Sequence, residues 1–266
     1  MPGGAALAVP PAFGLDSYTT SPPRGVETSL TPMAGNFVHE TPGILTINTH
    51  QARMSRMALT VRTGARMIEE TISAVKERHH CVMQTLTVAP GYKWKAWHIS
   101  QYIERIRKWA VLGEITLRYV WVCELQRRGA VHYHVMIWLP KRIQLPKADK
   151  QGWWTHGSTN TKAVYAPISY AIKYTTKGSS EAKLYPKGCR IAGSGGLTAS
   201  QRLERAWWAC PRWVRDQSKV EDLPRRAKGG GFCLRASGEL LESRWRVVSY
   251  GEGSVVICLK IPLGVP

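Results

Sequence analysis

The chain has 266 residues and a formal net charge of +19 at pH 7, from 37 Lys and Arg against 18 Asp and Glu. Hydrophobic residues make up 44% and charged residues 21%, which excludes a wholly disordered chain and allows a packed core. The positive excess favours a polyanionic partner, above all nucleic acid, and the sequence has neither a long apolar run nor a basic amphipathic anchor for a membrane.

Six cysteines are scattered through the sequence without a Cys-x-x-Cys pair. This spacing argues against a zinc finger, because structural zinc sites use closely spaced cysteines. The amino terminus also lacks the basic-then-apolar pattern of a secretory signal, so we expect a reducing, cytoplasmic location.

The first part of the chain divides into a tail and a helix. Residues 1–50 are rich in Gly, Pro, Ser and Thr without usable periodicity, which predicts a flexible N-terminal tail. Apolar residues then recur at three- and four-residue steps from Met54 to Val75, which predicts a long amphipathic helix.

A strand and a second helix are predicted next. Residues 81–88 form the strand, and its polar residues Gln84, Thr85 and Thr87 are unusual for a central strand unless it borders a site. Residues 95–110 carry isoleucines at helical spacing, which predicts an amphipathic helix.

Two further strands, 117–125 and 129–140, are separated by a short polar turn and predict a hairpin. His132 and His134 share one strand face by period two, and pairing across the turn brings Glu124 beside them. Two imidazoles and a carboxylate can supply half of the coordination sphere of a divalent cation. A His-x-His pair taken alone is more often a packed surface or core pair than a metal site, and the carboxylate and the motif downstream favour the metal site here.

The hairpin turn and the loop at 141–162 combine basic and aromatic residues, a mixture that can neutralise phosphates and stack bases. The alternative is that the tryptophan pair packs beneath the loop. The residues expected to bind DNA are Arg127, Arg128, Lys141, Arg142, Trp153 and Trp154.

A helix over 170–178 would place Tyr170 and Tyr174 on one face, and Lys173 and Lys177 likewise. A phenol, with a pKa near 10, is a weak nucleophile at neutral pH, and nearby cations favour the phenolate and can hold a phosphate oxygen. We therefore interpret these four residues as catalytic. The alternative is an amphipathic helix whose tyrosines pack and whose lysines are solvated.

The elements together predict an α+β fold with a central antiparallel sheet flanked by helices. We divide the chain into the tail (1–50), a domain that begins with the long helix (51–215), and a C-terminal part (216–266). In the last part, 219–231 is predicted to be a basic linker and 244–261 a terminal β-hairpin.

Three ordered motifs resemble those of the HUH endonucleases, the rolling-circle initiators with a His-hydrophobe-His strand. They are Gln84-Thr85-Leu86-Thr87-Val88, His132-Tyr133-His134, and the helix from Tyr170 to Lys177. The likeness covers 81–215 and is strongest to replication-associated proteins of filamentous (inovirus-type) single-stranded DNA phages.

The resemblance implies an RRM-like sheet and a metal-dependent endonuclease that nicks one DNA strand at an origin. It implies a 5′-phosphotyrosine link, rejoining of the strand, and Mg²⁺ or Mn²⁺ held by Glu124, His132 and His134. The implied partners are a single-stranded or supercoiled DNA origin and the helicase and polymerase of the bacterial host, in whose cytoplasm the protein would act.

Three other functions use similar residues. A transposase or plasmid relaxase would share the same chemistry, and a non-catalytic DNA-binding regulator would use the basic surface alone. A non-haem iron oxygenase also uses two histidines and one carboxylate, but its usual His-x-Asp/Glu spacing is absent here.

Overall fold

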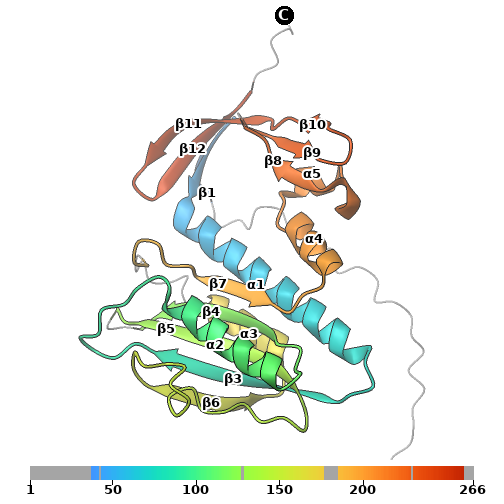
Figure 1. Cartoon of the computed structure of the whole chain (residues 1–266). Coiled ribbons are helices and arrows are strands. Elements are labelled where there is room, and N and C mark those ends of the chain that lie inside the picture. The colour runs from blue at the N-terminus through green and yellow to red at the C-terminus, as the bar shows by residue number, and fades with distance from the viewer. Residues whose placement is uncertain (1–36, 42, 127–128, 177–184, 229, 261–266) are drawn as a thin grey trace, which may run out of the picture. The chain divides into compact units, whose positions relative to one another are not determined.

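A computed structural model describes residues 37–41, 43–126, 129–176, 185–228 and 230–260. The fold is α+β, as the sequence predicts, and its central sheet is antiparallel throughout (Figure 1). The strands lie in the order β6 (Thr159–Val164), β3 (His79–Thr87), β5 (Val131–Pro140), β4 (Arg118–Leu125) and β7 (Ala192–Gly195). The predicted hairpin therefore forms the middle of the sheet.

Both faces of β5 are covered, and nine of its ten residues are buried. Val131, Tyr133 and Val135 point to one face, and His132 and His134 point to the other, because side chains alternate along a strand. Continuous burial explains why this strand is apolar almost throughout, apart from the two histidines.

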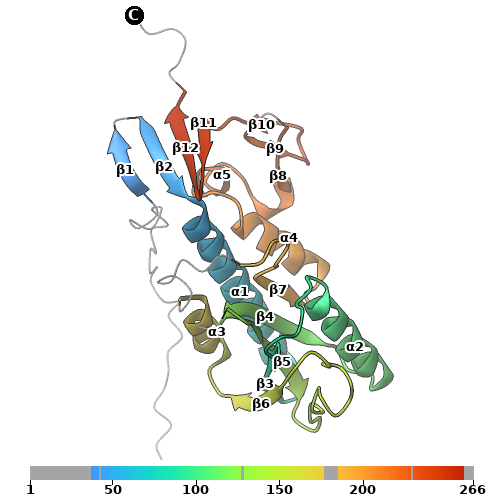
Figure 2. The same ribbon diagram turned by 90° about the vertical axis from the view of Figure 1, so that its left-hand side faces the viewer.

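Helices cover the two faces of the central sheet (Figure 2). On the histidine face, α1 (Thr49–Ser73) packs against β4 and β7, and α3 (Pro167–Thr176) packs against α1 and β4. On the opposite face, α2 (His98–Leu112) buries Ile99, Tyr102 and Ile106. The long helix and the second helix predicted from apolar spacing are thus confirmed, the former beginning five residues earlier than its first apolar position.

The face beneath α2 contains a buried aromatic cluster. The Tyr102 hydroxyl donates to Gln84 Oε1, and the Trp94 indole donates to the Tyr133 hydroxyl at 2.9 Å. Trp154 is 1% exposed, lies edge-on to Tyr102 and Tyr133, and donates its indole N–H to the Thr87 carbonyl at 3.0 Å. The polar residue Gln84 is therefore structural, with its side chain on the face away from the histidine pair.

A stacked histidine pair borders this cluster. The His98 and His156 rings lie 3.7 Å apart at 16°, and both are buried. Burial, together with the neighbouring His156 and Lys95, lowers the pKa of His98 to about 4. Burial and Arg105 also lower the pKa of His156. Both rings are therefore neutral at pH 7.

We expect the free energy of unfolding to decrease as the pH falls from about 6.5 towards about 4. In this window the unfolded chain binds a proton on His98 that the folded chain does not, so acid favours unfolding, by up to about 3 kcal/mol for His98. Urea unfolding at pH 7.5 and pH 5 measures the effect. The pH dependence should be smaller in His98→Gln, and an equal dependence in both proteins would contradict this account.

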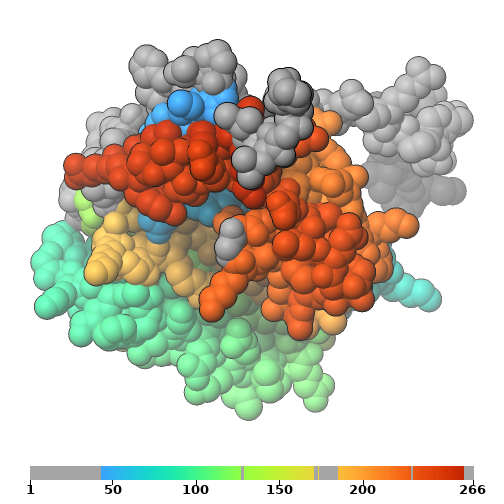
Figure 3. All heavy atoms as spheres, turned by 90° about the horizontal axis from the view of Figure 1, so that it is seen from above, coloured from blue at the N-terminus to red at the C-terminus, as the bar shows by residue number. Residues whose placement is uncertain are grey.

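A second sheet pairs segments from far apart in the sequence, in the order β1 (Phe37–Thr41), β2 (Ile44–Asn48), β12 (Ser254–Leu259) and β11 (Trp245–Gly251). The predicted terminal hairpin is thus confirmed, and Figure 3 shows its atoms at the surface in red. The predicted flexible tail extends too far towards the helix, because β1 and β2 belong to this sheet. Residues 1–36 of that tail lie outside the described residues.

The predicted basic linker at 219–231 is also wrong. A 3₁₀ turn (Val220–Asp222) leads into β8 (Pro224–Arg226), which pairs with β9 (Phe232–Leu234), and β9 pairs with β10 (Leu240–Leu241). This small sheet has its own core, formed by Cys210, Val214, Phe232, Leu234 and Leu241.

Two helices connect the central sheet to this small sheet. Helix α4 (Ala199–Trp208) begins at a capping box between Thr198 and Gln201, and α5 (Arg212–Arg215) follows Pro211. Within the described residues, no helix has both the length and the apolar character needed to cross a bilayer.

Candidate active site on the β4–β5 hairpin

The hairpin register places three potential metal ligands together. Glu124 is directly opposite His132, and Val122 is opposite His134, so the carboxylate and both imidazoles share one face of the sheet. The turn that fixes this register includes Gly129 at φ +81°, a left-handed conformation that glycine adopts without strain. The short loop and the period-two alternation therefore bring the three side chains together as predicted.

The three side chains are in close contact. The two imidazole centroids are 4.7 Å apart, and His134 Nε2 lies 2.9 Å from Glu124 Oε2. His134 is buried, and Glu124 and His132 are partly buried. Within the described part of the chain, no three His, Cys, Asp or Glu side chains are arranged as a ligand group for a metal ion. Here Glu124 bonds to the imidazole nitrogen that would otherwise face a cation.

Neighbouring polar groups orient both imidazoles. Thr85 Oγ1 lies 3.3 Å from His134 Nδ1, and Thr87 Oγ1 lies 3.4 Å from His132 Nδ1. Gln126 Nε2 lies 2.7 Å from His132 Nδ1. These contacts hold each ring by its Nδ1 side. Because an amide nitrogen only donates, His132 Nδ1 accepts from Gln126 here, and metal binding through Nε2 would require the Gln126 amide to turn so that its oxygen accepts from Nδ1–H. The polar residues Thr85 and Thr87 thus border the site, as their unusual presence in a central strand predicts.

Gln126 was missed in the sequence interpretation. It follows Glu124 by two residues, so strand periodicity extended into the turn would have placed both side chains on the same face. The polar run from Gln126 to Gly129 instead favours a turn at this position.

Tyr185 and Cys189 also border the site. The Tyr185 hydroxyl donates to the Cys123 carbonyl at 3.0 Å, and the Arg53 guanidinium lies 5.4 Å from the Tyr185 ring centroid. Burial raises the pKa of Tyr185, so this phenol is held protonated. The Cys123 and Cys189 sulfurs are 3.6 Å apart as free thiols. No sequence pattern indicated these contacts, because they join residues more than 60 positions apart.

The predicted tyrosine helix is present as α3. Tyr170 is partly buried and packs against the edge of the main core, and Lys173 is exposed. The backbone of Tyr174 belongs to α3, but its side chain is outside the described part, and Lys177 lies outside the described residues altogether. Since α3 contacts β4 and α1, it lies on the same face of the sheet as Glu124, His132 and His134.

The residues predicted to bind DNA have different positions. Lys141 and Arg142 are exposed just after β5, and Arg142 pairs with Glu77 at 3.2 Å. Arg127 and Arg128 lie outside the described residues.

The prediction that Trp153 and Trp154 bind DNA is wrong, because they are 8% and 1% exposed and their rings belong to the core. They pack beneath the loop, as the alternative interpretation held. The end of that predicted loop is itself a strand, β6, hydrogen-bonded to β3.

Residues 81–179 match the family model for the replication-associated protein ORF2/G2P. The matched segment contains β3, the β4–β5 hairpin and α3, so it includes every residue assigned above to the candidate active site except Arg53, Tyr185 and Cys189. This match supports a replication initiator family and a role in DNA replication. No curated protein and no solved structure matches the chain.

Proposed function

We propose that this protein is an HUH-superfamily initiator of rolling-circle replication, related to the replication-associated proteins of filamentous single-stranded DNA phages. It would nick one DNA strand through a tyrosine, retain the 5′ end covalently and rejoin the strand. The observation that carries the proposal is the hairpin register, which sets Glu124 opposite His132 and next to His134 inside the replication-associated segment.

The donor set suits a divalent cation. Glu124 offers a carboxylate oxygen and the histidines offer two imidazole nitrogens, a set that binds Mn²⁺ and tolerates softer ions, and Mg²⁺ is a further candidate. These residues would hold the ion once Glu124 releases its contact with His134 Nε2. Bound there, the ion would withdraw charge from a non-bridging oxygen of the scissile phosphate.

The nucleophile is supplied by α3, on the same face of the sheet. In the proposed step, the phenolic oxygen of Tyr170 or Tyr174 forms a bond to phosphorus while the bond from phosphorus to the 3′ oxygen breaks. The phenol proton passes to solvent, and the departing 3′ oxygen takes up a proton to become a hydroxyl. The phosphotyrosine ester retains the energy of the phosphodiester, so rejoining requires no nucleotide hydrolysis.

The lysines of the same helix would support this step. Lys173 is exposed and lies one turn from Tyr170, so its ammonium can approach a bound phosphate, and Lys177 repeats the spacing from Tyr174. Two tyrosines would let one molecule hold the old 5′ end on one phenol while the other cuts the regenerated origin.

The remaining parts of the proposal concern the setting. The net charge of +19 supports binding to a DNA origin that is single-stranded or supercoiled. The host helicase and polymerase would then unwind and copy the template. Six free thiols, including the close pair Cys123 and Cys189, are compatible with a reducing bacterial cytoplasm.

A covalent adduct is the direct test. The protein is incubated with Mn²⁺ and a panel of 5′- and 3′-labelled single-stranded origin fragments, and the products are separated under denaturing conditions. We expect a protein–DNA adduct that carries the 3′-labelled portion, with peptide mapping to Tyr170 or Tyr174. DNA binding without any adduct across the panel would instead support a non-catalytic DNA-binding regulator.

A further inference from the structure

A cavity of about 180 Å³ lies on the other face of the central sheet, between α2 and the edge formed by β4 and β7. No residue assigned to the candidate active site lines it. Its polar and aromatic lining consists of Ser100, Arg107, Tyr119, Trp121, Arg190 and Ser194.

Two glycines shape the wall of this cavity. A Cβ atom at Gly193 would lie 2.6 Å from Trp121 Nε1, and one at Gly195 would lie 2.5 Å from Tyr119 Cε1. The rings of Trp121 and Tyr119, both on β4, therefore lie so close to β7 that only glycine fits at these two positions. The rings are almost fully buried and form a rigid wall, which leaves recognition to the polar groups at the rim.

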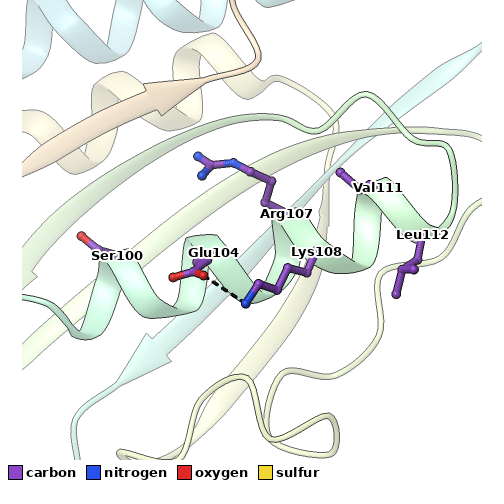
Figure 4. Close-up of a pocket in the computed structure, with 6 residues that line it drawn as sticks. All are labelled: Ser100, Glu104, Arg107, Lys108, Val111 and Leu112. Carbon is purple, nitrogen blue, oxygen red and sulfur yellow. Dashed lines mark ion pairs between the residues drawn. The ribbon is translucent and has the colours of Figure 1, made fainter.

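The rim carries two cations that no carboxylate neutralises. Arg107 and Arg190 are both exposed, and among the described residues neither guanidinium lies within 4.0 Å of an acidic oxygen. The Arg190 guanidinium lies 5.7 Å from the Trp121 ring centroid. Figure 4 shows Arg107 leaving α2 in a direction different from that of the Glu104–Lys108 ion pair.

A third arginine adds positive charge behind the wall. The Arg205 guanidinium donates to Ser194 Oγ, and burial with the neighbouring Arg202 lowers the pKa of Arg205. Cations gathered in this way attract an anion more strongly than a neutral ligand, and guanidinium groups match the oxygen geometry of phosphate.

We propose that this cavity is a second DNA-binding site, which holds one backbone phosphate of single-stranded DNA. Phosphate oxygens accept hydrogen bonds from Arg107, Arg190 and the Ser100 hydroxyl. The inference deepens the proposed function, because it requires DNA as the ligand, but it requires no cleavage.

The position of Arg190 connects this cavity with the candidate active site. The next residue, Ile191, accepts a hydrogen bond through its carbonyl from the Cys123 amide at 2.8 Å, and Cys123 precedes Glu124. A strand that crosses the β7 edge of the sheet can therefore contact both sites. A free phosphate ion would gain nothing from the short path between this cavity and the candidate active site, whereas a DNA strand could occupy both. We therefore assign the cavity to a DNA strand.

The test compares binding of a fluorescent oligothymidylate by anisotropy, with EDTA present so that no cleavage occurs. Arg107→Gln and Arg190→Gln should each weaken binding about three- to tenfold and reduce the slope of log K against log salt by about 1. The matched control is Lys108→Gln, which removes the neighbouring positive charge on α2 outside this cavity and should change affinity less than about twofold.

Crosslinking gives an independent measurement that does not depend on the variants. An oligonucleotide containing bromodeoxyuridine should crosslink to peptides that include 99–107 or 188–195. Arginine variants that behave like Lys108→Gln, without these crosslinks, would overturn the second site but leave the proposed function intact.

Two further outcomes are distinguishable. If the wild-type protein binds no DNA, the proposed function fails together with this inference. If thymidine monophosphate binds in a manner that requires both arginines, while oligonucleotide affinity is unchanged in the variants, the site belongs to a free nucleotide and the strand assignment is wrong.

Discussion

Replacing both Tyr170 and Tyr174 by Phe is expected to reduce adduct formation and nicking at least about a thousandfold. Phe retains the ring that packs Tyr170 against the core and removes the phenolic oxygen, so the helix should remain folded. Affinity for single-stranded DNA should change less than about twofold. Adduct yield on denaturing gels measures the loss, and anisotropy measures binding.

Tyr165 provides the matched control for this experiment. It precedes α3 by two residues and is 97% exposed, so Tyr165→Phe removes a nearby accessible phenol without disturbing packing. Its adduct yield should equal that of the wild type. An adduct that persists in the double variant and disappears in Tyr165→Phe would show that Tyr165 is the nucleophile, and it would contradict the proposal that a tyrosine of α3 attacks the phosphate.

The second large effect concerns the carboxylate and the imidazoles. His134→Asn, His132→Asn and Glu124→Gln are each expected to weaken Mn²⁺ binding at least about a hundredfold, because each removes one of three donors or its charge. Calorimetric titration of Mn²⁺ in the absence of DNA provides a readout independent of activity. The metal-dependent cleavage should be lost in parallel.

His79→Asn controls for the removal of an imidazole from the same sheet. His79 is opposite Pro140, at the far end of β5 from His132, and contacts the Glu77 carbonyl. Its substitution should leave the Mn²⁺ isotherm unchanged. Equal loss of binding in this variant, or unchanged binding in all three ligand variants, would contradict the proposed donor set.

The hairpin was predictable from the sequence because its register depends on residues that are close together in the chain. Period-two alternation assigns Glu124, His132 and His134 to one face, and a short turn with Gly129 leaves little freedom of register. The long helix α1 was equally accessible, since its buried residues follow helical spacing from Met54 to Ile68.

Local composition gave wrong predictions for residues whose burial depends on partners far away in the sequence. Trp153 and Trp154 have lysines nearby in the sequence, but in the structure Trp153 packs against α2 and Trp154 is hydrogen-bonded to β3. The strand β6 has a mostly polar sequence because it lies at the sheet edge with limited burial, so it has no clear strand pattern. The strand β8, which lies within the predicted linker at 219–231, shows no strand pattern for another reason: it has only three residues, and two of them are exposed arginines.

The border of the candidate site was only partly predictable. Thr85 and Thr87 were predictable, because polar residues are unusual in an otherwise buried strand. Tyr185 was not, because it contacts Cys123 from a segment with no recognisable motif. This contact joins residues more than 60 positions apart, and no local spacing encodes it.

The sheet that joins β2 to β12 also affects how this protein emerges from the ribosome. Ile47 of β2 pairs with Val255 of β12, which is 208 positions further along the chain. The ribosome therefore needs roughly 10 to 40 seconds after it has made β2 before it makes β12. Every strand of the central sheet has left the ribosome by then. The nascent chain can therefore complete its central sheet while the backbone N–H and C=O groups on one edge of β2 are still unpaired, and a chaperone that covers strand edges would protect β2 during this interval.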